Sequence, residues 1–135
     1  MNTLYLRRAL VLGLLSSIGP FAIDMYLPAL PALGRSLSAD AASVQWTLMA
    51  FFLTMGSCQL LYGPLSDMFG RKPPLFAGLT LFAIASVACG LSSNVESLIA
   101  WRALQGVGAC ATTVTPRAIV RDLYTGPDAA RLMSL

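Results

Sequence analysis

The stretch that decides the fold is GPLSDMFGRKP at residues 63–73, a short segment between two long apolar runs. No charged residue occurs from 41 to 66 or from 73 to 95. Each run is long enough for a helix across a hydrocarbon core, which takes about 20 residues. Because so short a connection forces the two helices to run antiparallel, the sequence predicts a membrane-spanning helical hairpin.

The residues of this loop predict a tight, positively charged turn. Gly63 and Gly70 supply the backbone freedom that a turn needs. Asp67 lies near the C-terminal end of a helix, where the macrodipole disfavours a carboxylate, so we expect it to be held by a cation. Arg71 and Lys72 are the nearest candidates.

The loop resembles the signature between helices 2 and 3 of the major facilitator superfamily, of general form G-x-L-a-D-r-x-G-r-k. Met68 stands where that family usually has a basic residue. The matching positions are Gly63, Leu65, Asp67, Gly70, Arg71 and Lys72. For the loop alone, a membrane hairpin with a basic turn is the plainer alternative.

The composition is typical of a membrane protein and excludes several other classes. Of 135 residues, 56% are hydrophobic and only 11% are charged. The net charge is +3, but the basic residues do not cluster, so we expect no nucleic-acid partner. Because histidine is absent, His-based catalytic triads and metal sites are excluded. Cys58, Cys89 and Cys110 lie in apolar runs and are interpreted as packing residues, not as a metal site. Because the sequence offers neither a nucleophile–base pair nor a metal cluster, no enzyme is predicted.

The apolar runs predict an all-α membrane protein with four transmembrane helices. Their expected bounds are about 9–33, 43–65, 74–91 and 97–121, with a fifth helix beginning near 128. The start of the chain could also be a signal peptide, but its apolar run continues past Asp24, so an uncleaved first helix is favoured.

The loop charges predict the orientation. One side holds six basic residues and the other holds only Arg35. By the positive-inside rule, the N-terminus and the 66–73 loop are therefore expected to be cytoplasmic. The six are Arg7, Arg8, Arg71, Lys72, Arg121 and Arg131.

Asp24 and Arg102 are charged residues inside predicted spans, at an estimated cost of ~2.5–3.5 kcal/mol each, so both are candidate functional residues. Each is expected some 8–10 Å below the outer surface. They form either a fixed ion pair between two helices or a site that responds to protons or substrate. Tyr26, Gln59 and Gln105 are candidate substrate contacts, because polar groups in hydrocarbon need partners.

Three further stretches resemble drug/proton antiporters of the Bcr/CflA type within the superfamily. Residues 23–31, IDMYLPALP, resemble their helix 1 signature. Residues 102–109, RALQGVGA, resemble the helix 4 signature R-x-x-Q-G-x-G-a, and the resemblance ties Arg102 to proton coupling. Residues 117–122, RAIVRD, resemble the inner end of that helix, whose acidic residue, here Asp122, joins the 63–73 loop in a charge relay.

The resemblance implies a secondary active transporter of the bacterial inner membrane, exporting drugs or other small hydrophobic compounds. It implies the proton gradient as energy source, no cofactor, and the lipid bilayer and a small-molecule substrate as partners. The family places its site between two six-helix bundles. This chain is therefore expected to be part of the N-terminal bundle, a fragment that needs its missing C-terminal helices and is inactive alone.

Small residues are expected to mediate helix packing. Gly106 and Gly108 match a dinucleotide-binding fingerprint on paper, but no strand precedes them, so we interpret them as packing residues. Ser86 and Gly90 have the spacing that allows close helix approach. On the first helix, the apolar face that includes Leu12 is expected to meet lipid.

Two other functions remain open on the sequence. The first is a complete four-helix multidrug exporter that acts as a dimer; Asp24 suits it, whereas Arg102 and the 63–73 loop do not. The second is a non-transporting scaffold subunit, in which Asp24 and Arg102 are purely structural.

Overall fold

The computed structural model describes residues 3–124, and within them all regular structure is helical. In chain order the elements are α1 (Thr3–Asp24), a 3-10 turn η1 (Leu27–Ala29), α2 (Leu30–Ser36), α3 (Ala41–Phe69), α4 (Lys72–Gly90) and α5 (Val95–Leu123).

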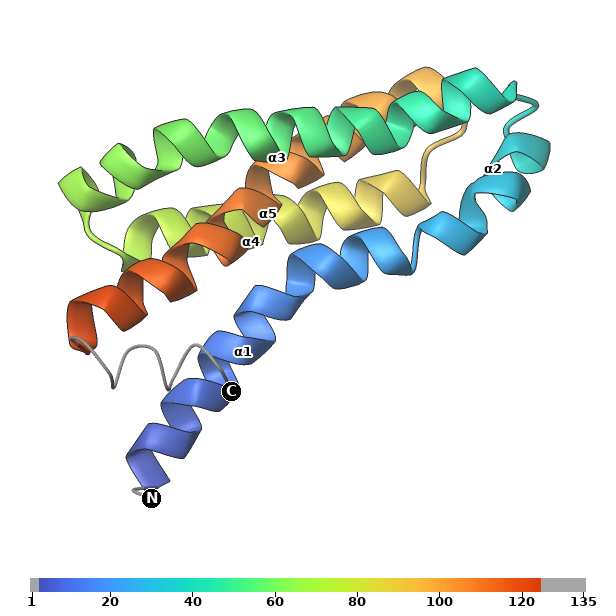
Figure 1. Ribbon diagram of the computed structural model, residues 1–135. Helices are drawn as coiled ribbons and strands as arrows, with labels where there is room; N and C mark the ends of the chain where they lie inside the picture. Colours follow the sequence, from blue (N-terminus) through green and yellow to red (C-terminus); the bar gives the residue numbers. More distant parts are fainter. Residues whose placement is uncertain (1–2, 125–135) are drawn as a thin grey trace.

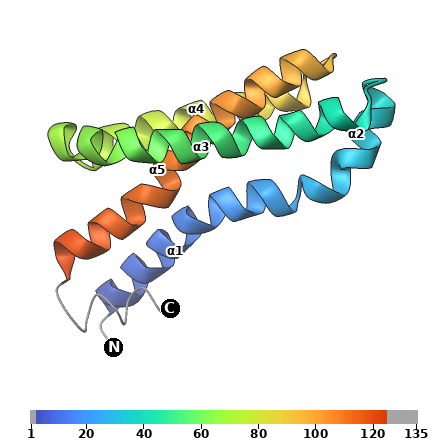
Figure 2. The same cartoon turned by 45° about the horizontal axis from the view of Figure 1, so that its top comes forward.

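The long helices form a bundle in which α5 is central (Figures 1 and 2). The start of α1, the α3–α4 connection and the end of α5 lie at one end, and α2 lies at the other. Helix α5 packs extensively on both α3 and α4, whereas α3 and α4 make few contacts with each other. The predicted hairpin is therefore antiparallel as expected, but its two helices are held apart by α5.

Three segments are long and apolar enough to cross a membrane by length and composition: Thr3–Ser36, Ala41–Phe69 and Lys72–Gly90. Helix α5 has the same 29-residue length as α3 but is more polar. Because α5 lies between α3 and α4, its polar side chains are kept away from lipid. Ionisable residues of membrane helices almost always face the interior of the bundle in this way. The predicted fold class, an all-α membrane protein, is confirmed.

The turn between α3 and α4 is shorter than predicted. Helix α3 continues through Gly63 and Pro64 to Phe69, so the expectation that Gly63 bends the backbone is wrong. The chain reverses at Gly70, whose φ of 86° lies in the left-handed region that favours glycine. Helix α4 then starts at Lys72.

The first span is not one continuous helix from 9 to 33 as predicted. Helix α1 ends at Asp24, and two shorter elements, η1 and α2, follow. Pro28 and Pro31 lack backbone N–H groups, so the helical bonds to the carbonyls of Asp24 and Leu27 cannot form. The fifth helix predicted near 128 lies outside the described residues.

Two glycines of α5 allow its backbone to touch its neighbours. A Cβ on Gly106 would overlap the carbonyl oxygen of Phe51 in α3. A Cβ on Gly108 would lie 2.6 Å from the carbonyl oxygen of Gly78 in α4. The predicted packing role of both glycines is confirmed, but Gly90 has nothing within 4 Å and takes no part.

Helix α1 packs mainly on α5. Leu12 is buried and forms a cluster with Val120. Nearer the other end, the Cβ position of Gly19 is 3.5 Å from the Thr113 hydroxyl. The prediction that Leu12 meets lipid is therefore wrong, because Leu12 packs against α5; Val11, on the same predicted face, is exposed.

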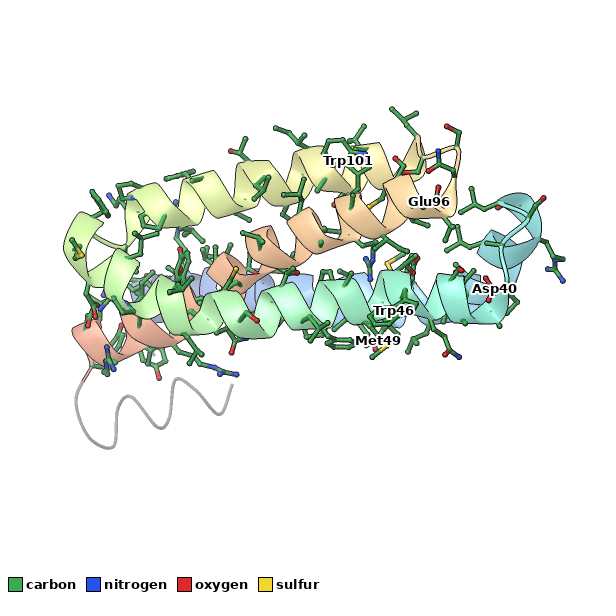
Figure 3. The ribbon with its side chains drawn as sticks, turned by 90° about the horizontal axis from the view of Figure 1, so that it is seen from above. Asp40, Trp46, Met49, Glu96 and Trp101 are labelled. Atoms are coloured by element: carbon green, nitrogen blue, oxygen red, sulfur yellow. The ribbon has the colours of Figure 1, made fainter. Side chains whose placement is uncertain are left out.

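Both tryptophans lie near the end of the bundle that carries α2 (Figure 3). Trp46 is on α3 and exposed, and Trp101 is on α5 and half-buried. Tryptophan is enriched where membrane helices leave the hydrocarbon, and the position of this pair is compatible with a membrane–water interface at that end.

We predict that Gly106→Ala destabilises the bundle, because the added methyl group meets the Phe51 carbonyl. Overpacking of this kind typically costs about 1–3 kcal/mol. Thermal unfolding in detergent measures the effect. Gly56→Ala is the matched control, since nothing lies within 4 Å of Gly56 and alanine favours a helix interior. Equal melting temperatures for the two variants would contradict the close approach.

Candidate functional site: a buried arginine and a charged loop

Arg102 lies inside the bundle with 2% of its surface exposed. It is seven residues into α5, about 10 Å from the start of that helix. Its Nη1 donates to Oε1 of Gln105 at 2.6 Å, and Nε2 of Gln105 donates to the Ser86 hydroxyl at 2.8 Å. Ser86 in turn donates to the Phe82 carbonyl at 2.7 Å, so the chain of bonds joins α5 to α4.

Two aromatic rings cover the guanidinium. The Cζ atom of Arg102 is 3.9 Å from the ring centre of Tyr26 and 4.5 Å from that of Phe51. The Tyr26 hydroxyl lies 2.5 Å from Oγ1 of Thr47. Because the Thr47 hydroxyl gives its proton to the Val44 carbonyl, Tyr26 is the donor in this pair.

The guanidinium keeps two donors, Nε and Nη2, that are buried and have no partner among residues 3–124. No carboxylate oxygen of these residues lies within 4.0 Å of an Arg102 nitrogen. Desolvating an ion costs several kcal/mol, whereas a cation–π contact returns roughly 0.5–2 kcal/mol. The charge of Arg102 is thus only partly compensated.

Asp24, the expected partner of Arg102, is exposed at the end of α1. The fixed ion pair considered from the sequence is therefore absent from this arrangement of residues 3–124. The other interpretation, a site that responds to protons or substrate, stays a prediction.

The three candidate substrate contacts separate into two groups. Tyr26 and Gln105 lie together at Arg102. Gln59 is half-buried and 12 residues beyond Thr47 on α3, about 18 Å along the helix. The sequence did not indicate Phe51 as a neighbour of Arg102. Thr47 could have been suspected of a polar contact, because it is a hydroxyl residue inside an apolar span.

At the other end of the bundle, Arg71 bridges two helices. Its Nη1 is 2.7 Å from Oδ1 of Asp67, in the last turn of α3, and 3.1 Å from the Ser66 hydroxyl. Its Nε and Nη2 donate to the two carboxylate oxygens of Asp122, near the end of α5, at 2.8 and 3.4 Å. We call Asp67, Arg71 and Asp122 the charged latch.

The latch pairs opposite charges, but its carboxylates are exposed to solvent. The hydrogen bond to Asp122, together with the charge of Asp67, raises the pKa of Arg71, so this side chain remains a cation. The carboxylate side chains are 58% and 45% exposed, and ion pairs in such positions contribute about 0–1 kcal/mol. Of the other predicted loop residues, Gly70 makes the turn, whereas Gly63 lies within α3 and Lys72 is exposed.

Two of the three cysteines, Cys58 and Cys110, serve as packing residues. Cys110 is buried in a cluster with Tyr62 and Ala111, and Cys58 packs against it. Within residues 3–124 there is no group of three or more His, Cys, Asp or Glu side chains that could hold a metal ion.

The family model of the Major Facilitator Superfamily matches residues 12–135. The chain belongs to this superfamily. The expected family is confirmed, whereas the assignment of the chain to an N-terminal bundle stays a prediction; transporters of this family typically work without a cofactor.

Several relatives are named as transporters or resistance proteins. The chain is 46% identical over 127 residues to an uncharacterized MFS-type transporter, YdgK, of Bacillus subtilis, covering 94% of this chain and 32% of the relative. It is 38% identical over 115 residues to multidrug resistance protein D of Escherichia coli, covering 85% and 29%. It is 35% identical over 125 residues to a bicyclomycin resistance protein homolog of Haemophilus influenzae, covering 93% and 31%. The chain thus spans less than a third of these relatives.

Proposed function

We propose that this chain forms the first part of a secondary transporter that exports drugs or other small hydrophobic compounds in exchange for protons. The family and the names of the relatives support drug efflux. The protein would lie in a bacterial inner membrane and take its energy from the proton gradient.

The observation that carries proton coupling is Arg102, a buried cation with two unpartnered donors beside the segment that bears Asp24. A carboxyl group near a guanidinium favours its charged form, whereas one in an apolar site favours its protonated form. Movement of α1 relative to α5 would therefore load and release a proton at Asp24. Arg102 keeps its own proton at cellular pH and tunes the carboxyl group.

Transport would require more than the four spans of this chain. The chain covers 29–32% of three named relatives, and the family forms its substrate site between two helical bundles. Tyr26 and Gln105, which lie at Arg102, are the best-placed substrate contacts, and Gln59 is the more distant one. Family membership weighs against the four-helix dimeric exporter, and a scaffold without transport is an outcome of the test below.

We predict that Asp24→Asn in the full-length protein abolishes proton-driven efflux, because the amide cannot carry the proton. Arg102→Lys should weaken efflux, since lysine lacks the paired donors of a guanidinium. The measurement is release of protons from acid-loaded inverted vesicles when bicyclomycin is added, followed with a pH-sensitive dye.

The matched control is Glu96→Gln, the same chemical change at an exposed position near the start of α5. It should leave efflux unchanged. Proton-coupled export by Asp24→Asn would place the proton carrier elsewhere, and absence of transport in the parent protein for a panel of hydrophobic drugs would favour the scaffold.

We further propose that the charged latch, with Gly70 as its turn, is a gate that holds one state of the transport cycle. Asp67→Asn or Asp122→Asn should impair export yet change thermal stability little, because exposed ion pairs contribute about 0–1 kcal/mol. Asp40→Asn, at the opposite end of α3, is the control. Normal export by both latch variants would show that the loop is only a turn and has no gating role.

Finally, we propose that the latch and the N-terminus face the cytoplasm, as the six basic residues on that side indicate. In a background with alanine at Cys58, Cys89 and Cys110, a membrane-impermeant thiol reagent added to intact cells should label Ser93→Cys but not Met68→Cys. Both positions are exposed, so burial does not decide the result. The reverse labelling pattern would invert the topology.

A further inference from the structure

The two unpartnered donors of Arg102 are suited to one carboxylate. Nε and Nη2 lie on the same edge of the planar guanidinium, while Nη1 is already bonded to Gln105. Two parallel N–H groups on one edge match the two oxygens of a carboxylate, the strongest pairing that arginine makes. Among the acidic residues at 3–124, Asp24 is closest in sequence to a residue that touches this guanidinium, namely Tyr26.

Tyr26 and Asp24 share one short, irregular segment. Helix α1 ends at Asp24, and the Tyr26 N–H bonds to the Ile23 carbonyl at 3.0 Å in a turn. The Tyr26 ring lies over Arg102 and its hydroxyl bonds to Thr47. Because only Met25 separates Asp24 from Tyr26, rotation of this turn moves both side chains relative to α5.

Phe51, the second ring over Arg102, is fixed by contrast. It is fully buried in the middle of α3, and its carbonyl lies against Gly106. Of the two rings, the one in the turn is free to leave without disturbing the contact between α3 and α5. Besides Tyr26, the titratable group that faces Arg102 is Cys89 of α4.

We propose that Tyr26 is a positioning residue that exchanges with Asp24 on Arg102. In the arrangement seen here, the ring covers the guanidinium and Asp24 is exposed, with no ion pair to Arg102. When Asp24 has released its proton to water, the turn rotates, the Tyr26–Thr47 bond breaks, and the carboxylate binds Nε and Nη2. Protonation of Asp24 reverses the exchange, because a neutral carboxyl group no longer outweighs the ring. The role of this exchange in coupling rests on the proposed proton-driven transport.

A double-mutant cycle tests the exchange on the purified full-length protein in detergent, with thermal unfolding at neutral pH as the readout. Asp24→Asn alone should leave the melting temperature unchanged, since Tyr26 already occupies Arg102. In a Tyr26→Leu background, Asp24 should pair with Arg102, so adding Asp24→Asn should lower the melting temperature by several degrees. That extra stability in Tyr26→Leu should be lost as the pH is lowered and Asp24 becomes neutral.

Phe51→Leu is the matched control, because it removes the other ring and leaves Tyr26 in place. In that background Asp24→Asn should again have no effect. Thr47→Val provides a second arm that keeps the ring and removes its hydrogen bond; it should make the melting temperature sensitive to Asp24→Asn, though less than Tyr26→Leu does.

Additive melting temperatures in both the Tyr26→Leu and Thr47→Val backgrounds would overturn the exchange. Sensitivity to Asp24→Asn in the Phe51→Leu background would overturn the specific role of Tyr26. The result is independent of transport. Proton-coupled efflux by Asp24→Asn would refute Asp24 as the carrier while leaving a measured Tyr26–Asp24 coupling intact.

Discussion

Contact between the backbone of α5 and the backbones of α3 and α4 places Arg102 and Gln105 inside the bundle. At Gly106 and Gly108 no side chain separates the helices, and a methyl group at either position would collide with a neighbouring carbonyl oxygen. In a membrane, where lipid is as apolar as leucine, helices associate through such close packing and through interhelical hydrogen bonds. Thr54 adds one of these bonds, donating to the Ala103 carbonyl at 2.8 Å.

This central position explains how a span can contain Arg102. A guanidinium on the lipid side would remain exposed to hydrocarbon, whereas here Gln105 and two rings surround it. The same packing that buries the charge leaves no carboxylate of residues 3–124 within ion-pair distance of it. An ion that is buried but only partly paired is stabilised by any rearrangement that brings it a partner, and the proposed response of this site to protons rests on that property.

The sequence predicted the parts of the fold that depend on local pattern. Charge-free runs located the spans, and the dipole argument at Asp67 anticipated its contact with Arg71. It did not predict that α5 would separate α3 from α4, because that depends on how small residues of three helices fit together. The break after Asp24 was signalled by Pro28 and Pro31, but prolines are also tolerated inside membrane helices, so the pattern was ambiguous.

The partners of Arg102 were beyond sequence reasoning for a related reason. Equal depth in the membrane suggested Asp24 as the partner of Arg102. The depth was correct to within two residues, since Tyr26 reaches the guanidinium. Depth does not specify which side chain of a turn points inward. Tyr26 is the one that points inward, where its hydroxyl donates to Thr47 and its ring covers Arg102.

Helix α5 also connects the two charged sites. Arg102 and Asp122 are 20 residues apart on it, about 30 Å, which is the thickness of a hydrocarbon core. Displacement of α5 relative to α3 therefore alters both the rings over Arg102 and the bond between Asp122 and Arg71. Pro116 lies between the two sites and lacks the N–H that would bond to Thr112, so the helix is weaker there than elsewhere. The half that bears Gly106 is fixed by backbone contact, while the half that bears Asp122 is held by α1 and by an exposed latch.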